Sequence, residues 1–334
     1  MKTMLTDEQI SLFSELLKRD NFCIVMHKSP DGDTIGSSFA LLCALKKMGK
    51  KAQIVCSDEI PPQMSFISDG LDVLDLTFEP ETVVSVDIAS EMLFGEKYKY
   101  LSDRVDFAID HHFSNTFYAK NTILCGKMSS AGELMYHLFK SADISFDDYI
   151  VQKLYTAISF DSGCFRFSNT SPETHLAAAE LLRYNFDASA INVKMFDCAS
   201  LAQLKIESDA LNSVRQYKDN KITMVTVRYS QVEKLGVNEN ELGGLTAITR
   251  RVAGTVVGIT VREKSDGEIR ISLRSQQEAP LPDFDVSKVA AKFGGGGHVR
   301  AAGLSMRCSV EQAEQQVLDA VIEEWDRLYD NSGK

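Results

Sequence analysis

The sequence predicts an α/β protein with two domains, in which a mainly parallel sheet flanked by helices is followed by a smaller mixed α/β domain. In the first half, short apolar, β-branched runs alternate with segments of helical periodicity, which is typical of a parallel sheet. From about residue 221 the pattern changes to strands that follow one another, with Asp266-Gly267 as a hairpin turn. A length of 334 residues suffices for two cores. We expect a first domain over residues 1–187, a helical connector over 188–215 and a second domain over 216–334.

The first strand-to-helix turn carries an unusual set of polar residues. Residues 22–26 form an apolar run that predicts a buried strand, and residues 37–48 have helical spacing. His27, Asp31 and Asp33 lie in the turn between them, at the edge of a sheet where α/β folds bind ligands. One imidazole and two carboxylates suit a divalent cation, although aspartates also serve as turn and N-cap residues.

Two further strands end in similar residues. The run 83–87 closes with Asp87, and the run 105–110 closes with Asp110, which His111 and His112 follow at once. The carboxyl ends of parallel strands share one edge, so we expect these side chains to meet those of the first turn. Asp161, which ends a predicted helix over 147–160, joins the same set. So many carboxylates repel one another unless cations lie between them, and mixed histidine and carboxylate ligation favours two Mn²⁺ ions, with iron, cobalt or zinc as alternatives and magnesium less favoured.

The remaining elements follow from periodicity and from breaker residues. Ser171 and Pro172 predict the N-cap and the first position of a helix. An alternation of aromatic and polar residues over 165–168 is typical of a half-buried strand. The other predicted helices cover residues 129–140, 172–184, 188–211, 286–292 and 310–329, and the other predicted strands cover 51–56, 222–227, 254–262 and 268–274.

A run of glycines marks the second domain. Gly295, Gly296 and Gly297 precede His298, and such a run allows backbone amides to turn toward an anion. We expect this run and Arg274 to bind the phosphate and sugar of a nucleotide, although a flexible hinge is the structural alternative. The arginines that compete with Arg274 as substrate contacts are Arg250, Arg251, Arg262 and Arg270.

Charge and cysteine content limit the partners and the compartment. The formal net charge is -11, which disfavours long duplex nucleic acid because such partners need a basic face. No apolar run is long enough to span a membrane, so we expect no membrane partner. Seven cysteines without CxxC spacing are typical of reduced thiols, and we expect a cytoplasmic protein.

At this point the sequence resembles the DHH phosphoesterases. Its segments HKSPDGDTIGS, SVDIAS, AIDHHFSN and FDSGCFRFSNTSPET match the four motifs of the DHH domain. The segments ISLRS and FGGGGHVRAAG are similar to the DHH-associated (DHHA1) substrate-binding domain. The size and the fourth motif are most similar to the nanoRNase/pAp phosphatase branch.

The resemblance implies a role for each residue of the predicted cluster. His112 would contact the scissile phosphate, and Asp110 would orient the histidines. A hydroxide that bridges the metals would attack the phosphorus, so no protein nucleophile is needed. The implied metal ligands are His27 and Asp31 for one ion, Asp33, His111 and Asp161 for the other, and Asp87 as the bridge.

The resemblance also implies a function and a location for it. We expect a phosphoesterase, with its active site in the cleft between the domains, that cleaves short oligoribonucleotides to mononucleotides and dephosphorylates 3′-phosphoadenosine 5′-phosphate (pAp). A cyclic di-AMP or pApA phosphodiesterase of the same family is the alternative, because its catalytic centre would be the same. An inactive nucleotide sensor is a second alternative, although every ligand position is filled. Dimerisation is compatible with the resemblance.

Overall fold

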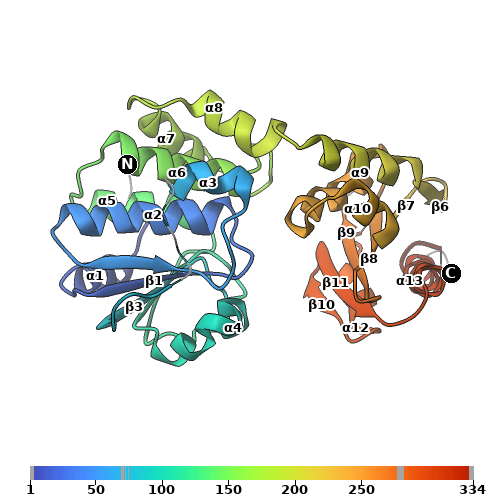
Figure 1. The fold of residues 1–334 in the computed structure, drawn as a ribbon, viewed down its shortest axis with the longest axis horizontal. Coiled ribbons are helices and arrows are strands. Elements are labelled where there is room, and N and C mark those ends of the chain that lie inside the picture. Colours follow the sequence, from blue (N-terminus) through green and yellow to red (C-terminus); the bar gives the residue numbers. More distant parts are fainter. Residues whose placement is uncertain (1–3, 69–70, 72, 74, 277–281, 331–334) are drawn as a thin grey trace. The chain divides into compact units, whose positions relative to one another are not determined.

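The computed structural model describes residues 4–68, 71, 73, 75–276 and 282–330 (Figure 1). The chain divides into two compact units, residues 1–198 and 199–334. This division falls inside the segment 188–215 that the sequence predicts as a connector, so the two units share that segment. Among the described residues, no helix has both the length and the apolar character that a membrane span needs.

The first unit contains a five-stranded sheet in which every neighbouring pair is parallel. The strands lie in the order β2-β1-β3-β4-β5. Their bounds are β1 Phe22–Met26, β2 Ala52–Val55, β3 Thr82–Val86, β4 Phe107–Asp110 and β5 Asn121–Leu124. Four of them confirm sequence predictions. The fifth, β5, is missed because its four residues are mostly half-buried and carry no apolar pattern.

Helices cover both faces of this sheet, as expected for an α/β domain. Phe22, Ile24 and Met26 pack in the larger core with α1, α2, α5, α6 and α7, whereas Cys23 and Val25 face the smaller core beside α4. Figure 1 shows α2, α5 and α6 on one side of the strands and α4 on the other. With both faces covered, the carboxyl edge is where polar side chains can gather. The helix bounds are α1 Asp7–Leu16, α2 Gly32–Lys47, α3 Ser65–Ser68, α4 Gly95–Tyr98, α5 Ala131–Ser141, α6 Asp148–Asp161, α7 Pro172–Leu181 and α8 Ala188–Asn192.

Three predicted elements need correction. The helix expected over 37–48 begins at Gly32, because the side chain of Asp31 caps it by accepting from the amides of Asp33 and Thr34. The strand expected over 165–168 is wrong, since these residues form turns and Phe165 has a left-handed φ of 62°. The continuous helix expected over 188–211 is also wrong: α8 passes into a π-helical turn over 193–197, and α9 begins after Ser200.

The second unit contains a six-stranded mixed sheet in the order β10-β11-β9-β8-β7-β6. Only the pair β7–β8 is parallel among its neighbouring strands. Helices α12 and α13 share one core with the sheet, and α9, α10 and α11 share another. Its strands are β6 Arg215–Tyr217, β7 Ile222–Val227, β8 Val257–Glu263, β9 Ile269–Ser275, β10 Gly296–His298 and β11 Ala301–Met306. Its helices are α9 Leu201–Asn212, α10 Tyr229–Leu235, α11 Leu245–Arg251, α12 Val286–Ala291 and α13 Val310–Trp325.

Candidate metal centre

The first strand-to-helix turn brings a histidine and a carboxylate together. His27 follows β1, and its Nδ1 lies 2.8 Å from the carbonyl of Lys28. A proton on Nδ1 that donates to this carbonyl leaves the lone pair on Nε2. That Nε2 lies 3.6 Å from Asp31 Oδ1 and 3.7 Å from Asp87 Oδ2. The contacts are longer than hydrogen bonds, but they suit ligands that share a cation.

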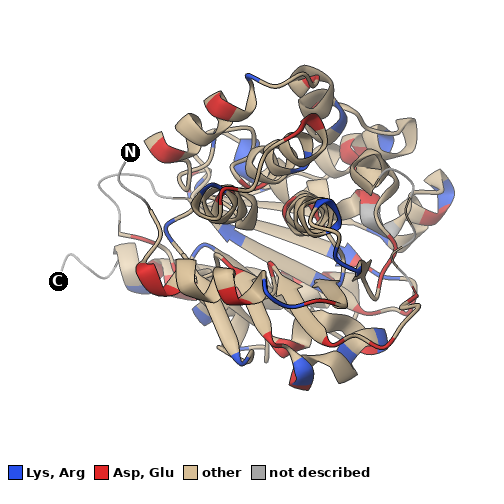
Figure 2. Ribbon diagram, turned by 90° about the vertical axis from the view of Figure 1, so that its left-hand side faces the viewer, with Lys and Arg blue, Asp and Glu red and all other residues tan. Residues whose placement is uncertain are grey.

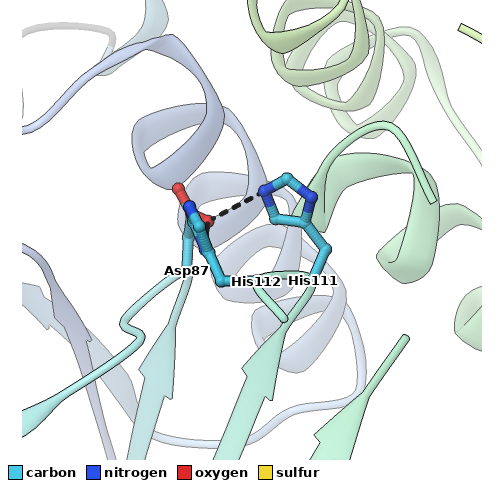
Figure 3. A group of neighbouring side chains, drawn as sticks. All are labelled: Asp87, His111 and His112. Atoms are coloured by element: carbon cyan, nitrogen blue, oxygen red, sulfur yellow. Dashed lines mark ion pairs between the residues drawn. The ribbon is translucent and has the colours of Figure 1, made fainter. Parts of the chain in front are cut away.

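Asp87 occupies a strained position directly after β3. Its φ of 62° is in the left-handed region, which costs a residue other than glycine about 1–3 kcal/mol. Its amide donates to the carbonyl of Ile109 at 2.9 Å, which fixes the residue to the end of β4. The side chain is 3% exposed, and its two oxygens face opposite groups: Oδ2 faces His27, and Oδ1 lies 3.5 Å from His111 Nε2 (Figure 3).

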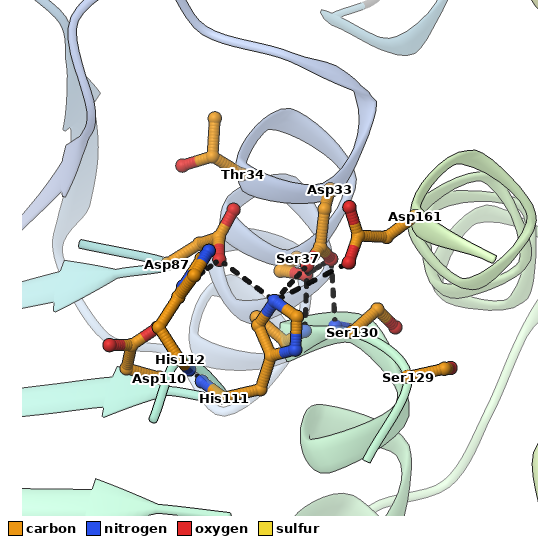
Figure 4. Close-up of polar contacts among 12 residues, drawn as sticks. Asp33, Thr34, Ser37, Asp87, Asp110, His111, His112, Ser129, Ser130 and Asp161 are labelled. Atoms are coloured by element: carbon orange, nitrogen blue, oxygen red, sulfur yellow. Dashed lines mark hydrogen bonds and ion pairs between the residues drawn. The ribbon is translucent and has the colours of Figure 1, made fainter. Parts of the chain in front are cut away.

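His111 has the same arrangement as His27. Its Nδ1 lies 3.3 Å from the carbonyl of Met128, so its Nε2 is directed at carboxylates. This Nε2 lies 3.6 Å from Asp33 Oδ2 and 3.5 Å from Asp161 Oδ2 (Figure 4). Both His111 Nε2 and Asp87 Oδ1 are buried without a hydrogen-bond partner. Since buried polar atoms rarely stay unpaired, these two atoms fit a cation that both could bind.

Asp110 and His112 form a hydrogen-bonded pair next to this cluster, and His112 Nδ1 also lies 3.4 Å from Asp87 Oδ1. Asp110 is fully buried, and its Oδ1 accepts from His112 Nδ1 at 2.8 Å, while its Oδ2 accepts from Asn115 Nδ2 at 2.6 Å. Burial opposes ionisation of both groups, yet their hydrogen bond and mutual charge lower the pKa of Asp110 and raise the pKa of His112. The hydrogen bond to Asp110 fixes the ring of His112. The side chain of His112 is nevertheless 41% exposed, so a ligand can reach it.

The carboxylates of the cluster repel one another, and bound cations would reduce this repulsion. Burial, followed by the charges of Asp161 and Asp31, raises the pKa of Asp33 well above its usual range. Burial and the charge of Asp33 do the same to the pKa of Asp87. Burial and the charge of Asp31 raise the pKa of Asp161 to about 7. Burial lowers the pKa of His111 to about 4, which keeps the imidazole neutral, as metal ligation requires.

The residues present fit a pair of divalent cations. Two groups that share no residue have ligand atoms close enough to hold one ion each: His27, Asp31 and Asp87, and Asp33, His111 and Asp161. A third such group, Asp87, His111 and His112, overlaps both. The contact between Asp87 and His111 joins the two groups. Neutral imidazoles and carboxylates suit manganese, iron, cobalt or zinc better than an all-oxygen site would. The structure thus brings together all eight residues that the sequence predicts at this edge of the sheet.

Sequence reasoning missed the groups that orient these ligands. The amides of Ala131 and Gly132, at the start of α5, donate to Asp33 at 2.7 and 2.9 Å. Asn169 Nδ2 donates to the carbonyls of Ser129 and Asp161, at 2.8 and 3.0 Å. The serines before α5 signal its N-cap in the sequence, but nothing there shows which carboxylate its amides face.

In the second unit, Arg274 and His298 lie in one row across three strands. His298 pairs with Ala301, which in turn pairs with Arg274, so all three lie on the same face of the sheet. Burial and the charge of Arg250 lower the pKa of Arg274. Such a pair of cations is suited to an anionic ligand.

The glycine run has a structural role in the same sheet. A Cβ on Gly295 would lie 2.4 Å from the carbonyl oxygen of Gly303, and one on Gly297 would lie 2.4 Å from that of Ala301. The amide of Gly295 donates to the carbonyl of Ala290. Close strand packing therefore requires two of the glycines, and the use of this run to bind phosphate stays a prediction.

Residues 21–158 match the DHH family, N-terminal domain, and residues 219–326 match the DHHA1 domain. The chain is 28% identical to the bifunctional oligoribonuclease and PAP phosphatase NrnA of Thermus thermophilus, over 96% of this chain and 95% of that protein. It is 26% identical to the protein of the same name from Bacillus subtilis, over 90% of this chain and 93% of that protein. The fold is similar to that of an exopolyphosphatase-related protein from Bacteroides fragilis, with a TM-score of 0.88, 23% identity and coverage of 98% and 99%.

Proposed function

Since the chain belongs to the DHH family and is a phosphate-ester hydrolase, we propose that it uses two Mn²⁺ ions to cleave short oligoribonucleotides and to dephosphorylate pAp. The observation that carries the proposal is the pair of ligand groups joined through Asp87 and His111. The names of the relatives, oligoribonuclease and PAP phosphatase, support the two substrates. Figure 2 shows acidic and basic residues interspersed along the chain, which suits a short substrate better than a long duplex.

We assign the ligands of one ion to His27 and Asp31 and those of the other to Asp33, His111 and Asp161, with Asp87 shared. Bound divalent ions would lower the pKa of water and neutralise charge on the phosphate. The chain's own residues then position the substrate. His112, whose Nδ1 is held by Asp110, presents Nε2 to a phosphate oxygen. Because Asp110 raises the pKa of His112, the ring can donate a proton in that contact.

We also propose that Arg274, His298 and the glycine run contact the substrate. Replacement of either side chain by alanine should raise KM roughly tenfold and keep kcat within about twofold, since a contact made equally in the ground and transition states affects binding alone. Arg307→Ala is the matched control, because this arginine is 73% exposed in its side chain and pairs with Asp266.

The experiment that tests the function is a turnover assay with Mn²⁺ on pAp, an RNA dinucleotide, an RNA 5-mer, pApA and cyclic di-AMP. We expect release of mononucleotides from RNA and of phosphate from pAp. Asp87→Ala should reduce kcat by about 100-fold or more, because it removes the shared ligand. Asp103→Ala, which changes an exposed aspartate, should leave kcat unchanged.

The outcomes separate the alternatives. A higher kcat/KM on cyclic di-AMP or pApA would replace the oligoribonuclease proposal by second-messenger hydrolysis at the same centre. Nucleotide binding without any turnover would contradict both and leave a sensor. Gel filtration of the same preparation tests the homodimer, and fractionation of cells tests the cytoplasmic location that the seven free thiols favour.

A further inference from the structure

Phe113 is an exposed aromatic side chain beside the metal centre. It directly follows His112 and is 85% exposed, more than any other large apolar side chain in the described part of the chain. Burial of a phenylalanine is worth about 1.5–3 kcal/mol, so the fold gains little from this ring where it lies. A single exposed apolar residue is ordinary, so the position of this ring, rather than its exposure, is the informative feature.

The ring lies against a glycine in the turn that follows β5. A Cβ on Gly126 would approach three atoms of the Phe113 ring at 2.6–2.9 Å, so only glycine leaves room for the ring in this position. Gly126 follows β5 and comes two residues before Met128, whose carbonyl holds His111. The ring, which follows His112 in the chain, thus lies against the turn whose Met128 carbonyl holds His111.

We propose that Phe113 is a stacking platform for a nucleobase of the substrate; this inference rests on the proposed hydrolysis of nucleotides. A nucleotide whose phosphate meets His112 carries its base on the adjoining sugar, within reach of the next side chain along the loop. Stacking of a base on an aromatic ring contributes about 1–3 kcal/mol and tolerates every base, because each has a π-face. That tolerance suits an enzyme that acts on short RNA of any sequence.

The test compares a substrate that has a base with the same molecule without one. Phe113→Ala should raise KM for pAp roughly tenfold and leave kcat within about twofold. The same variant should leave KM unchanged for 1-deoxyribose 3,5-bisphosphate, which lacks the adenine. Phe113→Tyr should restore the wild-type KM for pAp, because the ring is kept.

A second variant displaces the ring without removing it. Gly126→Ala places a methyl group against the Phe113 ring, and a ring at the end of a side chain can move away. We expect KM for pAp to rise several-fold while the melting temperature changes by only about 1–2 °C. Phe117→Ala is the matched control, because Phe117 lies in the same loop and is 64% exposed. Phe117→Ala should change neither KM for pAp nor the melting temperature.

Two results would overturn the platform: an equal loss on pAp and on the abasic analogue, or no loss on either. If the wild-type protein hydrolyses neither compound, the proposed function fails, and binding then tests the platform alone. For that purpose Phe113→Trp is made in a Trp325→Phe background. Quenching of its fluorescence by AMP, but not by ribose 5-phosphate, supports stacking, and the absence of quenching contradicts it.

Discussion

Replacement of a predicted metal ligand by its neutral isostere should stabilise the metal-free protein at alkaline pH. Asp161 has a pKa of about 7 in the folded chain, against an ordinary value of 3.8. A carboxyl whose pKa is raised by folding contributes stability below its unfolded pKa, and this stability is lost as the pH rises through the folded pKa. Asp161→Asn stays neutral throughout, so the variant escapes this loss.

The magnitude follows from these two values. At pH 5 the protonated Asp161 would retain about 3 kcal/mol of stability, and at pH 8 it would retain almost none. The side chain is 31% exposed, and solvent screening reduces this difference. We therefore expect Asp161→Asn to equal the wild type at pH 5 and to exceed it by about 1–2 kcal/mol at pH 8.

Asp161 lies in the first unit, whereas the single tryptophan, Trp325, lies in the second. Tryptophan fluorescence would therefore not report on unfolding around Asp161. Hydrogen exchange of peptides that cover β1 and β3 gives the free energy of opening in the full-length, metal-free chain. Added Mn²⁺ should reverse the order of the two proteins at pH 8, since a ligand at 100 times its Kd adds about 2.7 kcal/mol to the protein that binds it. Asp103→Asn is the control. Equal opening energies at pH 8, or no reversal by Mn²⁺, would refute the reasoning.

Three further predictions concern positioning, packing and the metal. Asp110→Asn should lower kcat about 100-fold and move the alkaline limb of the pH profile to lower pH, because Asp110 raises the pKa of His112; an unmoved limb would contradict this. Gly132→Ala should lower the free energy of unfolding, measured in urea, by about 1–3 kcal/mol, because the added Cβ would lie 2.4 Å from the Cβ of Ala157. The control Gly243→Ala, whose Cβ would meet no atom within 4 Å, should change the free energy of unfolding by less than about 0.5 kcal/mol. A chelator should abolish turnover and added Mn²⁺ should restore it; full activity after dialysis against the chelator would rule out metal dependence.

The sequence predicts an element correctly where its residues carry a strong local signal, such as an apolar run or a helix cap. The buried strands β1 and β3 have apolar, β-branched runs, and α7 has both its N-cap and a proline at its first position. Two of the elements that were missed lack such signals: β10 is three residues within a glycine run, and β5 is four residues of mixed polarity. Tertiary pairing, rather than local propensity, makes them strands.

The site was predictable for a different reason. Strand ends in a parallel sheet share an edge, so a list of polar residues after strands is also a list of neighbours in space. This rule places Asp87 and the DHH residues together without knowledge of side-chain geometry. The groups that orient them could not be found in this way, because the amides of Ala131 and Gly132 belong to backbone far along the chain from Asp33.

The described contacts distinguish Asp87 from two other buried carboxylates of the site, Asp33 and Asp110. Asp33 accepts hydrogen bonds from two amides at the start of α5, where the helix dipole is positive, and Asp110 accepts from His112 and Asn115. Asp87 has no such compensation at Oδ1, although it is buried among acids and held in a strained backbone conformation. The residue that faces both ligand groups thus has an oxygen without a hydrogen-bond donor. Cations held by the two ligand groups would therefore offset the repulsion among the carboxylates around Asp87, which would couple the stability of this edge of the sheet to the metals that the proposed reaction requires.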